Sequence, residues 1–498
     1  DPLARYKLSP TPSDRVVFHD IMENDYASIR TKYSKYYWGN RVPKNTSLLA
    51  LRAYELFREN ISDFALFGSV NDISHNVENI ADETDTEEAV EARFEALLAA
   101  LLSRMKLVVI ILGEDDDAQV VFETLNSKGE PLLAMDLVRN NIFHRAERQS
   151  LEIDELYQEL WDPFDQPWWR ESAPFSRPRR PRLDHFLAYT LAAETGENIS
   201  MRELYAEYRA FAVPRGQRRF HSVEDELRVL QHYAPLYKVL EGEIDGDQTL
   251  AWLGTKFVSW QLTTAYPVAM RLMREDVSSD ERQQIARLIY SYIVRRTLCG
   301  LTSKNLNRVF QSLTHAFVQA TPSVANLRAF FVARVGDSTR FPDDREFTQG
   351  ILAQPAYQLA HGTRMADVLW ELELASRSSL AEQMTKPTGM WVEHVLPRSW
   401  NEDWPFDDGV FTERWSGEVK AQDRNRVIHT LGNLTLLSSK LNISSGNRKF
   451  VEKAEKFEKH TGLFLNKWFT GKSRWAEVEI QERSQYLASL AVEVWPDL

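Results

Sequence analysis

The sequence predicts an α+β protein that is predominantly α-helical and carries a short strand–strand–helix unit near its C-terminal end. Three observations lead to this prediction. Apolar residues recur at helical spacing through most of the stretch between 151 and 374. The clearest strand is a single β-branched run at 106–112. Two further strand-like runs, 390–397 and 433–437, precede an amphipathic segment that begins near Phe450.

The first part of the chain is expected to be mostly helical around one buried strand. The expected elements before residue 149 are a helix over 47–59, a polar loop over 71–88, a helix capped by Thr86 that runs toward Ser103, the strand 106–112, an acidic loop at 113–117, a turn at 127–131 and a helix over 133–145.

The middle of the chain is expected to be helical, with one irregular interruption. The expected helices lie within 204–211, 227–240, 252–272 and 285–298. Between 161 and 182 several prolines prevent a regular helix. A polar stretch that ends in Lys386-Pro387-Thr388-Gly389 marks a boundary. We therefore predict three domains, at 1–148, 149–375 and 376–498, as expected for a chain of 498 residues.

Composition limits the class of protein. Hydrophobic residues make up 43% and charged residues 27% of the chain, a balance typical of globular proteins. No apolar run approaches the roughly 18 residues that span a bilayer, so no membrane partner is expected. The single cysteine, Cys299, excludes an intramolecular disulfide and a cysteine-rich zinc site, and lies in an apolar stretch typical of a core residue. These features favour a cytoplasmic location.

The charge is unevenly distributed. The net charge is −12, yet twelve Lys and Arg face only four acids between 420 and 475. Such a basic segment suits a phosphate backbone, and Arg448, Lys449 and Lys453 are candidate DNA-binding residues. The alternative, a solvated helix face on which lysines alternate with glutamates, is equally compatible with the charges.

The strand–strand–helix unit carries a recognisable set of polar residues. These are Glu393-His394-Val395-x-Pro397, then Gly432-Asn433-Leu434-x-x-Leu437, then Asn442. Their order and spacing resemble the HNH, or ββα-metal, nuclease motif. The simpler alternative is a hydrogen-bonded structural histidine, which the joint pattern disfavours.

The HNH resemblance implies a role for each residue. His394 corresponds to the general base that deprotonates water, and Asn433 to the residue that orients this base. Glu393 and Asn442 would supply oxygen ligands to a divalent metal, Mg²⁺ or Mn²⁺. Asn447, beside the start of the helix, is a second candidate for the place of Asn442.

The segment Ile428-His429-Thr430-Leu431-Gly432-Asn433-Leu434-Thr435-Leu436-Leu437 narrows the resemblance. It is similar to the nuclease domain of GmrSD-type (type IV, modification-dependent) restriction enzymes. Two upstream segments agree, Val121-Phe122-Glu123-Thr124-Leu125-Asn126-Ser127-Lys128-Gly129 and Tyr292-Ile293-Val294-Arg295-Arg296-Thr297-Leu298-Cys299-Gly300.

This second resemblance implies a ParB/sulfiredoxin-like N-terminal domain that hydrolyses nucleoside triphosphates and gates the nuclease. Glu123 and Asn126 are then candidate nucleotide-binding residues, with a capped helix–turn junction as an equal alternative. The hallmark Asp-Gly-Gln-Gln-Arg motif of that domain does not occur here, and the first residue is Asp1 rather than Met. We therefore expect the chain to lack its natural N-terminus and place its own nucleotide hydrolysis in doubt.

One further segment suggests contact with DNA. Trp168 and Trp169 precede Arg179 and Arg180 in the proline-rich interruption, and aromatic rings beside arginines can stack on a flipped base. Tryptophans buried against neighbouring helices are the favoured alternative.

Together these features predict a metal-dependent endonuclease of an anti-phage defence system, acting on modified foreign DNA and gated by a nucleoside triphosphate. The alternatives are a catalytically weak DNA-binding or effector subunit and an RNA-cutting toxin. A homodimer and a separate defence-system partner are both compatible with the sequence.

Overall fold

The fold was analysed in a computed structural model of the chain. The structure describes residues 12–39, 42, 48–67, 87–106 and 133–498, apart from 177, 215–218, 379, 381, 383 and 407. The chain divides into two compact units, Asp1–Asp116 and Asp117–Leu498. The first unit ends before residue 148, where we predicted the first domain to end. The second unit contains both segments that we predicted as separate domains, 149–375 and 376–498.

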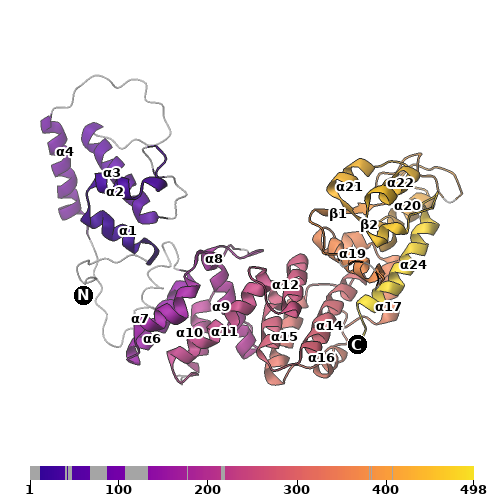
Figure 1. The fold of residues 1–498 in the computed structure, drawn as a ribbon, viewed down its shortest axis with the longest axis horizontal. Helices are drawn as coiled ribbons and strands as arrows, with labels where there is room; N and C mark the ends of the chain where they lie inside the picture. Colours follow the sequence, from indigo (N-terminus) through magenta and orange to yellow (C-terminus); the bar gives the residue numbers. More distant parts are fainter. Residues whose placement is uncertain are drawn as a thin grey trace. The chain divides into compact units, whose positions relative to one another are not determined.

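The first unit is helical in its described residues (Figure 1). Its elements are α1 (Pro12–Glu23), α2 (Tyr26–Lys32), the 3₁₀-helix η2 (Ser34–Tyr36), α3 (Leu49–Phe67), α4 (Glu87–Ala99) and the π-helical turn η3 (Ala100–Arg104). A small core of Val17, Ile29, Tyr33 and Leu51 joins α1, α2 and α3. The helix expected over 47–59 is confirmed by α3, while the predicted strand and loops at 107–132 lie outside the described residues.

The second unit begins with a long series of helices. They are α6 (Ala134–Arg148), α7 (Ile153–Leu156), η4 (Tyr157–Trp161), η5 (Asp162–Phe164), α8 (Pro167–Arg170), α9 (Arg182–Thr195), α10 (Leu204–Ala212), α11 (Val223–Glu241), α12 (Gln248–Trp260), η7 (Thr263–Ala265), α13 (Tyr266–Arg274), α14 (Ser279–Leu298), α15 (Leu306–Gln319), α16 (Val324–Val332), α17 (Asp344–Ala353), α18 (Ala356–Leu359) and α19 (Thr363–Ser376). The helices expected in the middle region are confirmed with one exception.

The exception is the stretch 252–272, which we expected to be one helix. It forms α12 and α13, separated by η7. Gln261 caps α12 with a left-handed backbone (φ 56°), which an apolar periodicity does not reveal. Pro267 then lies at the start of α13, where its missing N–H has no helical partner to lose.

The C-terminal part holds a strand hairpin surrounded by helices. Its elements are β1 (Met390–His394), α20 (Val419–Val427), η8 (Leu431–Asn433), β2 (Leu434–Ser438), α21 (Ser439–Ser445), α22 (Phe450–His460), α23 (Phe464–Lys467) and α24 (Glu477–Val494). β1 and β2 pair antiparallel, from Met390 opposite Ser438 to His394 opposite Leu434. The expected order of strand, strand and helix is confirmed.

Between β2 and α22 the chain forms α21, a short helix that we did not predict. Asn442 lies inside α21, whose N-cap Ser438 accepts a hydrogen bond from the Leu441 N–H. The helix ends at Gly446, which adopts φ 46°. The helix start predicted near Phe450 is confirmed by α22.

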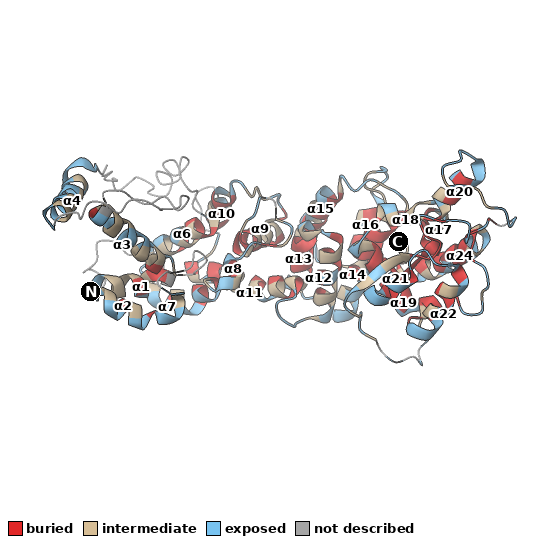
Figure 2. Ribbon diagram, turned by 90° about the horizontal axis from the view of Figure 1, so that it is seen from above, coloured by how far each residue is buried: buried red, intermediate tan, exposed pale blue. Residues whose placement is uncertain are grey.

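Two hydrophobic clusters meet at the hairpin. Figure 2 shows the buried residues of the middle helices in red. The larger one extends from α6 through the middle helices and includes Leu434 and Leu436 of β2, together with Leu487 of α24. The smaller one packs Leu437 and α22 against tryptophans of the loop after β1. The hairpin is therefore anchored in the same core as the middle helices.

Buried arginines of α14 tie this core to the end of the chain. The Arg295 side chain is fully buried, and its Nε and Nη2 donate to the Trp495 carbonyl at 2.9 and 2.6 Å. Nη1 donates to the Pro342 carbonyl. Cys299, at the C-cap of α14, packs against the same core, and burial raises the pKa of its thiol to about 12, as expected for a structural cysteine.

The proline-rich segment 161–182 agrees with the simpler of its two interpretations, in which its tryptophans are buried against neighbouring helices. Trp169 is 1% exposed, and its ring lies within 6 Å of the rings of Phe164, Phe186 and Tyr237. The Arg182 guanidinium lies over Trp168 at 4.7 Å. These tryptophans are packed against helices rather than presented for stacking on a base.

Among the residues that the structure describes, no helix combines the length and apolar character that crossing a membrane requires. The ParB/sulfiredoxin-like fold expected for the N-terminal region stays a prediction.

The environment of His185 predicts that the stability of the folded chain depends on pH. Its Nε2 lies 2.9 Å from Ser176 Oγ, which already donates to the Pro178 carbonyl, so the imidazole is the donor. Burial, followed by the charge of Arg180, lowers the pKa of His185 to about 4. As the pH decreases, the unfolded chain therefore takes up this proton near pH 6.5, whereas the folded chain takes it up only near pH 4. The free energy of unfolding falls between these two pH values.

We expect His185→Gln, which keeps a donor for Ser176, to remove this contribution. Urea unfolding at pH 7 and pH 4.5 measures the free energy of unfolding of both proteins. The wild-type chain should lose more stability between these values than the variant, and equal losses would contradict the assignment.

Candidate active site

The hairpin places His394 at the end of β1. β1 ends at His394, and the Val395 N–H directly after it donates to the Asn433 carbonyl at 3.0 Å. The imidazole is 7% exposed. Because neighbouring strand residues point to opposite faces, Glu393 and His394 can act together only where the strand ends, as it does here.

Asn433 holds the turn that follows His394. Its Oδ1 accepts from the Leu396 N–H at 2.8 Å and from Trp475 Nε1 at 3.0 Å. Its Nδ2 donates to the carbonyls of Leu396 and Ile428, both at 2.9 Å. These bonds use both donors and both lone pairs of the amide. Asn433 therefore positions His394 through the backbone and has no capacity left for the imidazole.

The backbone around Asn433 lies directly against α24. A Cβ added to Gly432 would be 2.3 Å from the Ile480 carbonyl oxygen, so only glycine fits. Arg483 Nη1 donates to the carbonyls of Gly432 and Leu434 at 2.8 and 2.7 Å. The two neighbours of Asn433 are thus fixed by one buried side chain.

A second histidine completes the site. His394 Nε2 lies 3.2 Å from His429 Nδ1, and the two rings are nearly perpendicular. The Tyr357 ring packs edge-on against His394 with centroids 4.5 Å apart. The Tyr357 N–H donates to the His429 carbonyl, so α18 supports both imidazoles.

The imidazole of His394 is held neutral. Burial lowers its pKa to about 3, and the charges of His429, Arg398 and Lys453 act in the same direction. Burial and Arg398 also lower the pKa of His429. A neutral imidazole has one unprotonated nitrogen that can accept a proton, but burial in this form makes His394 a weaker base than an exposed histidine.

Glu393 has an internal partner. Lys453 Nζ lies 2.6 Å from Glu393 Oε1 and also donates to the carbonyls of His394 and Val395. Burial raises the pKa of Glu393, and the charge of Lys453 opposes this shift. The Lys453 side chain is completely buried, so it does not belong to the basic surface on which we expected it.

The two candidate asparagines differ in their surroundings. Within the described chain, Asn442 Oδ1 is buried without a hydrogen-bond partner, whereas Asn447 is exposed. α21, which carries Asn442, packs against β1 and β2. An unpaired carbonyl oxygen and a nearby strand carboxylate are donors that suit a hard divalent cation. The described residues contain no group of three or more His, Cys, Asp and Glu that could bind a metal, so any such site would depend on Asn442.

The remaining DNA-binding candidates lie at the surface and have acidic partners. Arg448 pairs with Glu452 at 3.0 Å and Lys449 with Asp403 at 3.2 Å. Arg180 lies 3.6 Å from Asp184, and Arg179 is exposed. The structure does not bring the last two together with His394 in one cluster of contacts. Glu123 and Asn126 lie outside the described residues.

Sequence reasoning missed His429 and Tyr357. His429 was part of the segment that carried the family resemblance, four positions before Asn433, and this position was its only signal. Tyr357 lies more than 30 residues before His394, and nothing in its local sequence indicates the contact.

Comparison with known proteins identifies two regions. Residues 341–490 match the family model for the C-terminal domain of GmrSD restriction endonucleases, and residues 2–143 match the N-terminal domain. A search of curated proteins found no match. The C-terminal match contains His394, His429, Asn433 and Asn442, and the two matches together cover more than half of the chain. The chain therefore belongs to the GmrSD family of restriction endonucleases.

Proposed function

We propose that this chain is a divalent-metal-dependent endonuclease of the HNH type that cuts modified foreign DNA. The observation that carries the proposal is the position of His394 at the end of β1, beside Glu393 and next to the turn that Asn433 fixes. Family membership supports DNA as the substrate. Regulation by a nucleoside triphosphate rests on the N-terminal match alone.

The contact between the two histidines suggests which nitrogen is the base. If His394 carries its proton on Nε2, it donates to His429 Nδ1 and leaves its own Nδ1 unprotonated. Nδ1 can then take a proton from water as the water oxygen attacks phosphorus. His429 stabilises the resulting imidazolium through the same hydrogen bond, as a positioning residue.

Glu393 and Asn442 are the residues that would hold the metal. When bound, a divalent cation stabilises the charge that develops on the phosphate and the leaving oxygen. Lys453 fixes the position of the Glu393 carboxylate through Nζ, and its charge opposes the rise of the Glu393 pKa that burial causes. Asn442 contributes a carbonyl oxygen that otherwise stays buried without a partner.

The first prediction concerns His394. We expect His394→Ala to cut plasmid DNA in Mg²⁺ or Mn²⁺ on the order of 10²–10⁴-fold more slowly than the wild type, because a general base contributes that factor. His221→Ala, at an exposed histidine, is the matched control and should cut normally. Modified DNA, unmodified DNA and RNA substrates are compared side by side with an EDTA control. Undiminished cutting by His394→Ala would contradict the proposal. Preferential cutting of RNA would show that RNA, rather than DNA, is the substrate.

The second prediction separates the two asparagines. We expect Asn442→Ala to weaken Mn²⁺ binding about tenfold or more, since it removes a ligand, while Asn447→Ala binds Mn²⁺ like the wild type. Titration with Mn²⁺ followed by electron paramagnetic resonance measures this without requiring DNA cleavage. If Asn447→Ala weakened Mn²⁺ binding and Asn442→Ala did not, the ligand would be Asn447.

The third prediction concerns His429. His429→Ala should lower kcat on the order of 10–100-fold, because the His394 tautomer is no longer fixed. His429→Asn offers an amide oxygen near the former Nδ1 position and should recover most of the activity. An equal loss in both variants, with unchanged melting temperatures, would show that the hydrogen bond does not position the base.

A further inference from the structure

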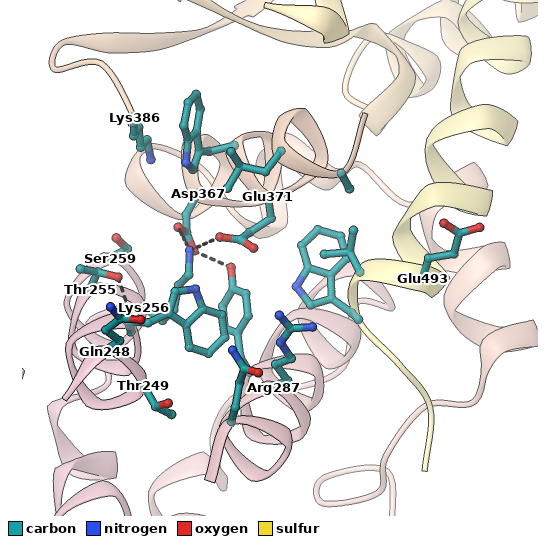
Figure 3. Close-up of a pocket in the computed structure, with 18 of the residues that line it drawn as sticks. Gln248, Thr249, Thr255, Lys256, Ser259, Arg287, Asp367, Glu371, Lys386 and Glu493 are labelled. Atoms are coloured by element: carbon teal, nitrogen blue, oxygen red, sulfur yellow. Dashed lines mark hydrogen bonds and ion pairs between the residues drawn. The ribbon is translucent and has the colours of Figure 1, made fainter. Parts of the chain in front are cut away.

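A large cavity lies away from the hairpin, within the second unit. It has a volume of about 1170 Å³ and is lined by α12, α14, α19 and the end of α24 (Figure 3). Small-molecule sites usually measure about 300–1,000 Å³, so a molecule of nucleotide size can enter. His394 and its neighbours do not line it.

The floor of this cavity is a buried charge cluster. Lys256 Nζ lies 2.7 Å from Asp367 Oδ1 and 2.5 Å from Glu371 Oε1. Asp367 Oδ2 accepts from Tyr290 and Trp260, so its oxygens are occupied. Figure 3 shows the contacts of Lys256 with Asp367 and Glu371 as dashed lines. Within the described residues, Glu371 Oε2 and the third Nζ proton of Lys256 have no hydrogen-bond partner and remain available for a ligand.

A further donor is buried beside the cluster. Trp495 lines the cavity and is 1% exposed, and its Nε1 has no hydrogen-bond partner among the described residues. A buried donor without a partner costs about 1–3 kcal/mol. Because this nitrogen is itself buried, a ligand in the cavity does not reach it unless the side chain moves.

Aromatic rings form the walls. Trp252, Tyr290, Trp370 and Trp495 all line the cavity, and Trp252 is only partly buried. Lys256 Nζ already lies over the rings of Trp252 and Tyr290, at 5.5 and 5.1 Å. A second cation is therefore disfavoured, whereas a flat neutral heterocycle can stack on Trp252, the one of these four rings that is partly exposed.

Two cations stand at the rim. Arg287 of α14 and Lys386, in the segment before β1, are exposed and line the cavity. Neither has an acidic partner within ion-pair distance in the described chain. Guanidinium and ammonium groups in this state suit a phosphate group.

We propose that this cavity binds a nucleotide, with its base against Trp252 and its phosphate at Arg287 and Lys386. One free carboxylate oxygen beside a free ammonium proton matches bases that place an amino group next to an unprotonated ring nitrogen on the Watson–Crick edge, as cytosine and adenine do. The nucleotide is either a free molecule or an extrahelical residue of DNA, and the second source rests on the proposed function.

Two helices connect this cavity to the nuclease site. α19 carries Asp367 and Glu371, and its Glu373 accepts from the N–H groups of Phe464 and Leu465 beside β2. α24 ends next to Trp495, and its Arg483 holds the neighbours of Asn433. A ligand in the cavity therefore contacts the helices that position His394.

The test measures binding to the whole chain in EDTA, so that it does not depend on cleavage. The probes are dCMP, dAMP, dTMP and deoxycytidine, and their binding is measured by tryptophan fluorescence and calorimetry. We expect the wild type to bind dCMP at least tenfold more tightly than dTMP and than deoxycytidine. No saturable binding of dCMP or dAMP would overturn the proposal, while leaving the His394→Ala cleavage assay unaffected.

Variants separate recognition from damage to the fold. Glu371→Gln should abolish the preference for dCMP over dTMP, and the double variant Arg287→Gln/Lys386→Gln should abolish only the preference for dCMP over deoxycytidine. Trp252→Phe should retain binding and Trp252→Ala should lose it. Glu197→Gln, at an exposed carboxylate outside the cavity, is the control. Unchanged preferences in the folded Glu371 and rim variants would overturn the proposal.

Competition identifies the source of the nucleotide. Displacement of dCMP by a duplex with an unpaired cytosine, but not by a fully paired duplex, would support an extrahelical base. Binding of dCMP or CTP that neither duplex displaces would support a free nucleotide.

Discussion

The Asn433 amide joins three segments that are distant in sequence: the turn after β1, the end of α20 and the loop before α24. Each of its hydrogen bonds contributes a modest net free energy, but removal of the amide would leave several buried backbone groups without partners. The position of His394 depends on this constraint, because the turn begins one residue after it. Gly432, directly before Asn433, adds a second constraint, because the backbone of α24 leaves no space for a Cβ at this position.

Buried charges connect the hairpin to the helices around it. Burial lowers the pKa of Arg483 to about 9, which still leaves the guanidinium charged at neutral pH, and its donors serve carbonyls that flank Asn433. Glu373 acts in the opposite sense, as a buried acceptor for the backbone of α23. A buried charge is stable only when such partners are present, and each partner lies on a different element. These contacts fix how the elements sit against one another more strictly than apolar packing, which tolerates small displacements.

The sequence predicted the elements of the active site better than its contacts. Strand, strand and helix follow from local patterns of apolar residues, and His394, Asn433 and Asn442 follow from their spacing within those patterns. The break between α12 and α13 did not, because it depends on a left-handed Gln261 that no periodicity encodes. The pairing of Glu393 with Lys453 spans 60 positions, and the contact of His394 with Tyr357 joins two separate elements. Contacts of this kind arise from tertiary packing, on which a single sequence carries no local signal.

The partners of the cations between 420 and 475 could not be predicted from the sequence either, and they change how this basic segment is interpreted. Of the cations between 420 and 475, Lys453 serves Glu393 and Arg424 is fully buried against Glu477 and two backbone carbonyls. Lys420 and Arg448 have acidic partners at the surface. Part of the positive charge in this segment therefore stabilises the fold and is not available to attract DNA. A phosphate backbone would meet the exposed remainder, including Lys440 and Lys459, on a protein whose net charge is −12. Repulsion by the rest of the chain then favours contact with DNA mainly where these cations are concentrated, near the helices that surround His394.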